Sequence, residues 1–213
     1  MTTNLLSYGL FTAPDTDEMS RLLADVFAQR DPPARAVSLS GSEFEAFVRL
    51  FCPKAEAEGL TVVARSPATG EMIGALLAED SASEPPDGLD QLSAKFFPIF
   101  DILGQLDTEY RSGRTVQPGE SIHLFLLGVV ERFAGRGVAQ RLIVECLANA
   151  VRRGYRLAVT EATNKTSQHV FRKQGFAERV YRSYTDHRFE GRAFFRSIAE
   201  QGGPILMDRR LVS

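Results

Sequence analysis

The amino-acid sequence predicts a mixed α/β fold, in which helices flank a central, largely antiparallel sheet. In the second half of the chain, apolar runs of strand length alternate with segments of helical periodicity. In the first half, two helical patterns precede two short apolar runs that are joined by a turn-rich pentapeptide, which is typical of a hairpin. Because hairpins and strand–helix–strand units occur in one chain, we expect a mixed sheet with helices on its faces.

The expected strands are short, apolar and bounded by turn residues. They span residues 4–12, 60–65, 71–78, 122–130, 156–162, 176–184 and 205–212. Residues 66–70, Ser-Pro-Ala-Thr-Gly, have the composition of a tight connection between two of them.

The expected helices are marked by capping patterns and terminators. Asp15 and Ser40 each precede a glutamate by three positions, as in a capping box. The Asp-Pro-Pro sequence at 31–33 ends the first helix; Pro53 is expected to disturb the second and Gly59 to end it. The remaining helices are expected at about 91–104, 137–153 and 165–174.

We interpret residues 1–213 as a single domain, a size that needs no second core. Residues 79–120 interrupt the pattern of strands with an acidic, Ser-, Pro- and Gly-rich stretch. They are interpreted as an insertion over the surface, either a substrate lid or a passive connector.

Composition argues against several classes of protein. The net charge is −2, whereas nucleic-acid binding needs clustered Lys and Arg. The longest apolar stretch, 124–130, is far too short to cross a membrane, and the first fifteen residues lack the basic residues of a signal peptide. We therefore expect a soluble, cytoplasmic protein without nucleic-acid or membrane partners.

The cysteines and histidines do not predict a covalent or metal framework. Cys52 and Cys146 are far apart in sequence, and Cys146 falls on the apolar face of the 137–153 helix, so a buried thiol is expected. His123, His169 and His187 lack metal-ligand spacing, and no metal is expected.

A glycine-rich turn between the 122–130 strand and the 137–153 helix predicts an anion site. The first amides of a helix have no internal partners, and the helix dipole adds positive potential there. Gly135 and Gly137 allow the backbone to approach a ligand, and Arg132 and Arg136 add positive charge. The turn lacks the Gly-Lys-Ser/Thr of a P-loop, and Gln140 stands where a dinucleotide fingerprint needs Gly or Ala.

Residues 122–184 resemble the core of the GCN5-related N-acetyltransferase (GNAT) superfamily. Residues 134–139 (AGRGVA) are similar to its Gln/Arg-x-x-Gly-x-Gly/Ala turn, with Ala134 in place of the leading Gln/Arg. Residues 164–176 (NKTSQHVFRKQGF) are similar to its second signature, Asn-x-x-Ala-x-x-Phe-Tyr-x-x-x-Gly-Phe. The resemblance implies the fold of that superfamily and an acetyl-CoA-dependent N-acetyltransferase, in which an amine attacks the thioester directly in a ternary complex.

The resemblance also assigns a set of residues to CoA. Pantetheine would lie along the 124–130 strand as an added strand, and the glycine turn would hold the pyrophosphate. The assigned residues are Leu127, Val129, Gly135, Arg136, Gly137, Val138, Ala139, Asn164 and Phe171. The tyrosine that usually protonates the leaving thiolate in the superfamily is replaced by Phe171, which leaves that acid unassigned.

The candidate catalytic residues are His123, Asp31 and Ser167. His123 stands where several members of the superfamily have a catalytic Glu or His, and an imidazole titrates near neutral pH. Asp31-Pro32 and the 163–167 segment are similar to insect-type arylalkylamine N-acetyltransferases, in which an acidic residue precedes proline. Ser167 or Thr163 would assist the acid step, although a hydroxyl there can also cap a helix. Glu161, at a strand end, is a further carboxylate candidate.

Two matters stay open at this point. Because Phe171 replaces the tyrosine, an alternative function stays open, that of a CoA-binding sensor without turnover. The sequence does not name the acceptor; a small-molecule amine is expected. The oligomeric state is open, and a homodimer would be unsurprising.

Overall fold

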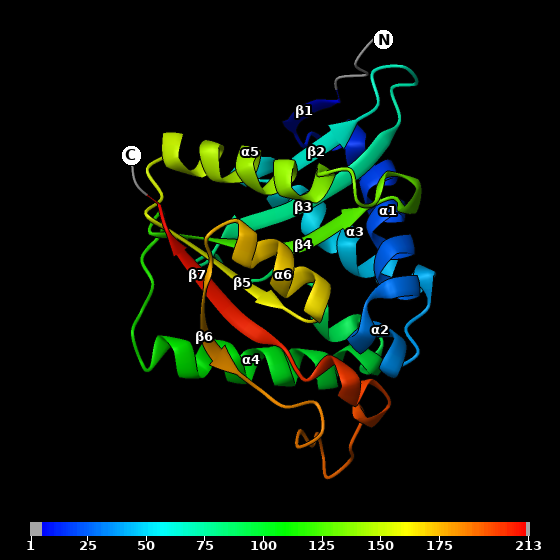
Figure 1. Cartoon of the computed structure of the whole chain (residues 1–213), viewed down its shortest axis with the longest axis vertical. Helices are drawn as coiled ribbons and strands as arrows, with labels where there is room; N and C mark the ends of the chain where they lie inside the picture. Colours follow the sequence, from blue (N-terminus) through cyan, green and yellow to red (C-terminus); the bar gives the residue numbers. More distant parts are fainter. Residues whose placement is uncertain (1–5, 212–213) are drawn as a thin grey trace.

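Seven strands form one sheet in the computed structural model, which describes residues 6–211 (Figure 1). The strands are β1 (Ser7–Leu10), β2 (Val62–Arg65), β3 (Met72–Asp80), β4 (Ser121–Val129), β5 (Leu157–Ala162), β6 (Ala177–Tyr181) and β7 (Ile205–Arg210). Their order is β1-β2-β3-β4-β5-β7-β6, and every neighbouring pair is antiparallel except β4 and β5. The predicted mixed, largely antiparallel sheet is confirmed.

Helices cover both faces of the sheet (Figure 1). They are α1 (Thr16–Arg30), α2 (Pro32–Ala36), α3 (Gly41–Glu58), α4 (Phe97–Arg111), α5 (Val138–Arg152) and α6 (Lys165–Lys173). One hydrophobic core joins α1, α3 and the start of α4 to the sheet, and another joins α5 and α6 to the opposite face. This separation follows from the apolar stripe that each helix presents to the strands.

Several expected boundaries were wrong. The Asp15 side chain does not cap α1; it accepts from the Thr12 amide at 2.9 Å and pairs with Arg65. The sequence at 31–33 ends α1 as expected but also starts α2, because Asp31 caps that short helix and proline is tolerated in its first turn. α3 continues through Pro53, which was expected to disturb it, and ends at Gly59 as expected. The expected ends at residues 4–5 and 212 lie outside the described residues.

The 79–120 segment contributes a helix to the fold. β3 continues to Asp80, and α4 begins and ends later than the expected 91–104 helix. Pro98 lies in the first turn of α4, where a missing N–H costs nothing, so it does not break the helix. Beyond residue 104, Leu106 is fully buried against β5, β6 and β7, and this packing sustains the helix through polar sequence.

The ladder between β4 and β5 is short. It pairs residues 121–123 with residues 157–159, and no later backbone pairs join the two strands. On the other edge of β4, Leu126 opposes Leu77 and Leu124 opposes Ala78, so Phe125 is an extra residue, a β-bulge that bends the strand. The ends of β4 and β5 therefore separate, which leaves one edge of β4 without a partner strand.

Cys146 is buried, as expected; Cys52 is buried as well, and both are free thiols. Burial raises the pKa of the Cys146 thiol to about 12, so this thiol is not reactive at neutral pH. Among residues 6–211, the helices do not combine the length and apolarity that a membrane span requires.

Candidate active site

The turn before α5 presents a row of free backbone donors. Gly135 and Gly137 have φ angles of 72° and 79°, a left-handed conformation that glycine adopts at little cost. Within the described chain, the N–H groups of residues 135–140 have no hydrogen-bond acceptor; the first amide of this region with a backbone partner is that of Arg141, bonded to Gly137. A methyl group added at either glycine would meet no protein atom within 4 Å, so the space beside them is open. These donors fit a diphosphate.

Basic side chains lie beside this turn. The Arg136 guanidinium stacks on the Phe133 ring, 5.4 Å from its centroid, and has no carboxylate partner among the described residues. Arg132 is paired with Glu71. Of the two arginines expected to add positive charge, Arg136 is therefore the one whose charge is not already compensated.

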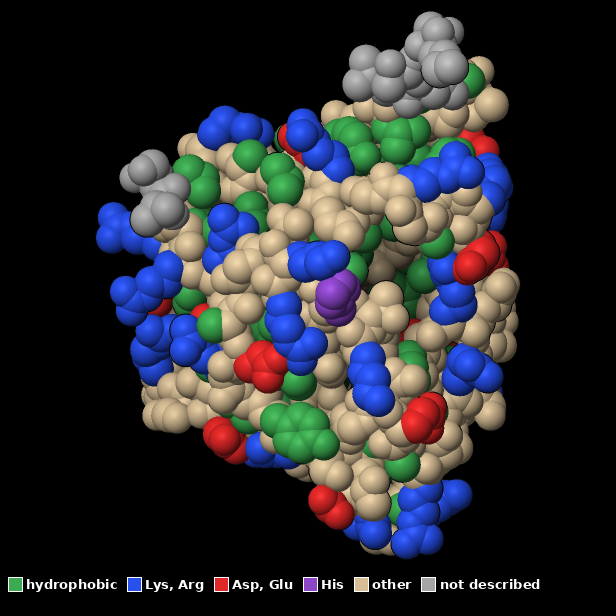
Figure 2. All heavy atoms as spheres, in the orientation of Figure 1, with side chains coloured by type: hydrophobic (Ala, Val, Ile, Leu, Met, Phe, Trp, Pro, Cys, Tyr) green, Lys and Arg blue, Asp and Glu red, His purple; other side chains and the backbone are tan. Residues whose placement is uncertain are grey.

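The free edge of β4 lies next to the turn. The Val130 amide donates to the Ile73 carbonyl of β3 at 2.9 Å. Because successive amides of a strand point to opposite edges, those of Leu127 and Val129 point away from β3, toward the side where β5 has separated. The Val129 carbonyl on this side accepts from Arg30 at 2.5 Å, which leaves its amide available. Figure 2 shows the surface hollowed between α6 and α1, beside the end of β4.

Asp31 and Thr163 are in contact where β4 and β5 separate. The Thr163 hydroxyl, directly after β5, donates to the Asp31 carboxylate at 2.8 Å. Arg30, the preceding residue, binds Val129 at the end of β4. The end of α1 thus bridges the ends of both strands. Asp31 is partly exposed as a residue. Desolvation of its carboxylate nevertheless raises the pKa of Asp31 to about 6. The hydrogen bonds from Thr163 and from the Ala34 amide act in the opposite direction and lower that pKa.

The residues after Thr163 form the cap of α6. The Asn164 side-chain oxygen accepts from the Ser167 amide at 2.9 Å, and the Ser167 hydroxyl donates to the Asn164 carbonyl at 2.9 Å. The Ser167 hydroxyl is therefore held in the helix cap rather than in contact with Asp31. The buried Tyr184 hydroxyl donates to the Thr163 carbonyl at 2.7 Å and fixes the segment from the other side.

Phe171 lies in the core rather than at an open surface. Its ring is 3% exposed and packs edge-on against Phe176, with 5.1 Å between the ring centroids. The position of the missing tyrosine is thus filled by a core side chain. Any contact of Phe171 with a cofactor is limited to the rim of the ring.

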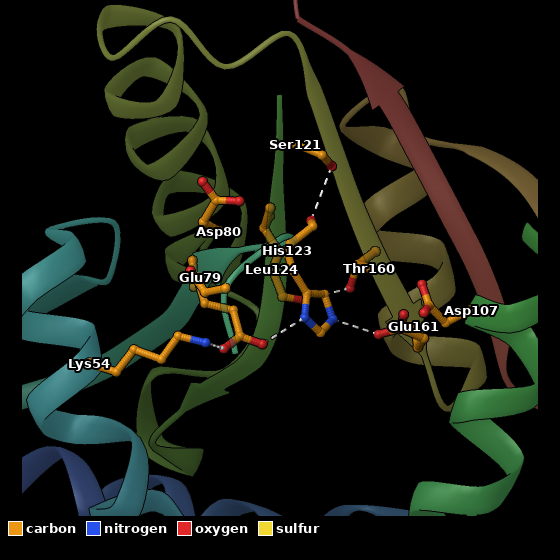
Figure 3. A network of polar contacts seen from close by, with 12 residues as sticks. Lys54, Glu79, Asp80, Asp107, Ser121, His123, Leu124, Thr160 and Glu161 are labelled. Atoms are coloured by element: carbon orange, nitrogen blue, oxygen red, sulfur yellow. Dashed lines mark hydrogen bonds and ion pairs between the residues drawn. The ribbon is translucent and has the colours of Figure 1, made fainter. Parts of the chain in front are cut away.

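His123 lies between two carboxylates (Figure 3). Its Nδ1 is 3.1 Å from Glu79 at the end of β3, and its Nε2 is 2.7 Å from Glu161 on β5. Glu79 also accepts from Lys54 of α3 at 2.7 Å. Burial by itself lowers the pKa of His123, but Glu161 and Glu79 outweigh it and raise that pKa to about 10. At neutral pH His123 is an imidazolium and carries its proton already.

This cluster lines a cavity of about 300 Å³ between the sheet and α3 and α4. The side chains of Leu157, Val159 and Glu161, which alternate along one face of β5, line its length. Thr163 is two residues beyond Glu161. The His123 cluster and the Asp31–Thr163 pair are therefore neighbours along β5.

Sequence reasoning missed Lys54 and Glu79, and it assigned no role to Tyr184. Glu79 opposes His123 in the β3–β4 ladder, and this register depends on the bulge at Phe125, which the sequence does not signal. Lys54 and Tyr184 reach the site from α3 and from the loop after β6, so only the tertiary structure brings them in. Within residues 6–211 there is no group of three or more potential ligands arranged to hold a metal ion.

Replacing His123 with glutamine is expected to lower the free energy of unfolding by about 3 kcal/mol at pH 6, because Glu79 and Glu161 lose the cation between them. The pKa of His123 is raised from 6.5 to about 10, so its stabilisation is fully present below pH 6.5 and is lost as the pH rises through about 10. Urea unfolding at pH 6 and pH 10.5 measures this, with the exposed His169→Gln as control. An equal loss at both pH values would contradict it.

Residues 53–176 match the family model described as the acetyltransferase (GNAT) family. The match covers more than half of the chain, and the chain belongs to this family. The fold and the family predicted from the sequence are thereby confirmed. The protein is an acetyl-CoA-dependent N-acetyltransferase.

Solved structures share this fold over almost the whole chain. The C-terminal condensation domain of Ebony, in complex with β-alanyl-dopamine, superposes with a TM-score of 0.89 at 13% identity, covering 98% of this chain and 100% of that one. Arylalkylamine N-acetyltransferase 2 from Aedes aegypti gives 0.81 at 20% identity, with the same coverage. The polyamine N-acetyltransferase from Drosophila melanogaster, which forms N-acetylagmatine, gives 0.78 at 17% identity, covering 97% and 100%. No curated protein sequence matches the chain.

Proposed function

We propose that the protein transfers the acetyl group of acetyl-CoA to a small primary amine by direct attack in a ternary complex. One observation carries this proposal. The free amides of residues 135–140 follow the free edge of β4, and the end of that edge is joined through Arg30 to Asp31, which contacts Thr163. A site that binds the donor and a carboxylate that can accept a proton thus adjoin one another. The small-amine class is supported by structures of the same fold that are described as arylalkylamine and polyamine acetyltransferases.

The donor is assigned to three features of the chain. The amides of Gly135 to Ala139 would hold the pyrophosphate, with Arg136 beside them. The amides of Leu127 and Val129 would pair with pantetheine as a strand does. Asn164 would bind the pantetheine arm only through its amide nitrogen, because its side-chain oxygen is held by Ser167. Acetyl-CoA supplies an activated thioester, and a backbone amide near Val129 would polarise its carbonyl oxygen.

We assign the role of general base to Asp31. Its pKa of about 6 leaves the carboxylate ionised at neutral pH yet basic enough to take a proton from the attacking ammonium. The C–N bond then forms as the C–S bond breaks, and the proton can return to the leaving sulfur through the Thr163 hydroxyl that contacts Asp31. Ser167 is assigned a positioning role, since its hydroxyl holds the turn that carries Thr163.

His123 is assigned to acceptor binding instead of to proton abstraction. With a pKa near 10 it is already protonated at neutral pH, so it cannot serve as the base in the free enzyme. Burial by itself raises the pKa of Glu79, but the bonds from His123 and Lys54 outweigh it and hold that pKa below its usual value. Glu79 and Glu161, which both contact His123, can bind an incoming ammonium. The cytoplasmic location and the homodimer expected from the sequence stay predictions.

An acceptor screen tests the proposal. Release of free thiol from acetyl-CoA is measured with a panel of primary amines, and the velocity is then recorded against both substrates. Direct attack in a ternary complex predicts intersecting double-reciprocal lines and no acetylated protein by mass spectrometry. Parallel lines with a covalent acetyl group would overturn the direct mechanism. CoA binding without turnover on any amine would overturn the proposed reaction.

A further inference from the structure

The cavity beside His123 adjoins a second, wider hollow. Tyr110 and Arg114, from α4 and the loop after it, and Leu157, at the start of β5, line both spaces. The first encloses about 300 Å³ and the second about 1080 Å³. A molecule that extends from Glu161 along β5 past Leu157 therefore reaches this hollow, at the end of the sheet where β4 and β5 begin.

The two ends of this passage differ in charge. At the inner end, the carboxylates of Glu79 and Glu161 have side-chain exposures of 16% and 11% and face His123. They are hydrogen-bond acceptors able to hold an ammonium group. At this end Lys54 and His123 balance the two carboxylates, so an ammonium can replace the imidazolium proton without a change in net charge.

The outer end is positive. Four arginines line the hollow against two carboxylates, Glu120 and Asp208; the arginines are Arg114, Arg156, Arg179 and Arg210. Arg179 is bound to Asp208 at 2.8 Å and Arg114 lies 3.7 Å from Glu120. Within residues 6–211 neither Arg156 nor Arg210 has a carboxylate within ion-pair distance, and both are exposed. Figure 2 shows Lys and Arg side chains gathered along the edge beside the end of β7.

The separation between the two ends is set by β5. Glu161 and Leu157 are four residues apart on one strand, which corresponds to about 13 Å. Arg156, the residue before Leu157 in the sequence, also lines the hollow. A ligand that reaches both ends must therefore be extended, with its polar groups at opposite ends and an apolar middle against Val159, Phe100 and Phe125.

We infer that the acceptor is a zwitterionic amine, whose ammonium binds at Glu161 and whose carboxylate or phosphate binds at Arg156 and Arg210. This inference rests on the proposed acetyl transfer to an amine and specifies the acceptor for that same site. A tail that ends in an anion meets complementary charge at the hollow, whereas a cationic tail is repelled there. The positive charge of the hollow thus selects, among the amines that Glu161 would bind, those with an anionic tail.

The test compares matched acceptors whose tails have the same length, at about 13 Å, and end in a carboxylate, a phosphate or a primary amide. In the wild-type enzyme we expect kcat/KM to be at least about tenfold higher for an anionic tail than for the amide, the effect of one charge-assisted hydrogen bond. The carboxylate and phosphate arms distinguish the two kinds of anion. The Arg156→Gln/Arg210→Gln double variant should lose the preference, so that its kcat/KM no longer differs between the anionic tails and the amide.

A charge-matched control separates this site from a general surface effect. The Arg152→Gln/Arg196→Gln double variant removes the same charge from exposed arginines outside both cavities, and it should retain the full preference. Equal use of amide and anionic tails by the wild-type enzyme would overturn the zwitterionic acceptor while leaving amine acetylation intact. A preference that persists in the Arg156→Gln/Arg210→Gln variant would also overturn it. A wild-type enzyme that acetylates no amine would overturn the proposed function with it.

Discussion

Replacing Gly137 with valine is expected to weaken CoA binding by at least about 100-fold, which corresponds to the loss of two charge-assisted hydrogen bonds. Gly137 has a φ of 79°, which valine adopts only with strain, so the turn should change shape and its amides should no longer converge on one anion. An added Cβ would also project into the open space that we assign to the pyrophosphate. Isothermal titration with CoA measures the effect.

A matched control distinguishes loss of the site from loss of the fold. Gly113, after α4, also has a φ of 79° and open space around an added Cβ, so Gly113→Val imposes the same backbone strain, about 1–2 kcal/mol, away from the glycine turn. We expect both variants to lose similar stability in urea unfolding and only Gly137→Val to lose CoA affinity. Wild-type affinity in Gly137→Val would show that the pyrophosphate binds elsewhere.

Replacing Asp31 with asparagine is expected to lower kcat by about 10²–10⁴-fold at neutral pH, because the variant lacks a group that can accept the ammonium proton. CoA affinity should be unchanged, since the donor amides of residues 135–140 do not contact Asp31. In the wild-type enzyme the rate should rise with pH through about 6, as Asp31 ionises, and this limb should be absent from the variant. An unaltered pH–rate profile would remove Asp31 as the base.

Stability provides an independent check on the same residue. The folded-state pKa of Asp31 is raised from 3.8 to about 6, so the folded protein holds this proton more tightly than the unfolded chain. The resulting stabilisation is present below pH 3.8 and is lost as the pH rises through about 6, a loss of roughly 3 kcal/mol. Because asparagine also caps a helix, Asp31→Asn should be at least as stable as the wild type at pH 7.

Thr163→Val is the companion variant. It removes the hydroxyl that donates to Asp31 while keeping the shape of the side chain. Since that bond lowers the pKa of Asp31, its loss should shift the lower limb of the pH–rate profile upward. A slower rate with no shift of this limb would assign Thr163 to the acid step alone.

Local patterns predicted the parts of the fold that depend on short stretches of sequence. The turn at 135–137 and the helix after it were placed correctly, because glycine spacing and an apolar stripe are properties of consecutive residues. Where packing overrides local preference, prediction was less accurate. The expected 91–104 helix is instead 97–111. Ile102 and Leu106 are buried on folding, but the polar residues around Leu106 in the sequence did not indicate a helix there.

The candidate site divides in the same way. His123 and Asp31 were singled out from the sequence, but their ionisation was not predictable, because it depends on what surrounds them. A histidine expected to titrate near neutral pH is held protonated by Glu79 and Glu161, which are 44 and 38 residues away in sequence. Desolvation raises the pKa of Asp31 to about 6 against the bond from Thr163, 132 residues away, which lowers it.

The sequence by itself determined the family, the mixed sheet and the glycine turn before α5, because each is encoded in residues that are neighbours along the chain. Only the tertiary structure shows that Asp31 contacts Thr163, that two carboxylates face His123, and that the cavity beside His123 adjoins a hollow lined by four arginines. Charge and burial act through space, and a linear pattern does not contain the distances on which they depend.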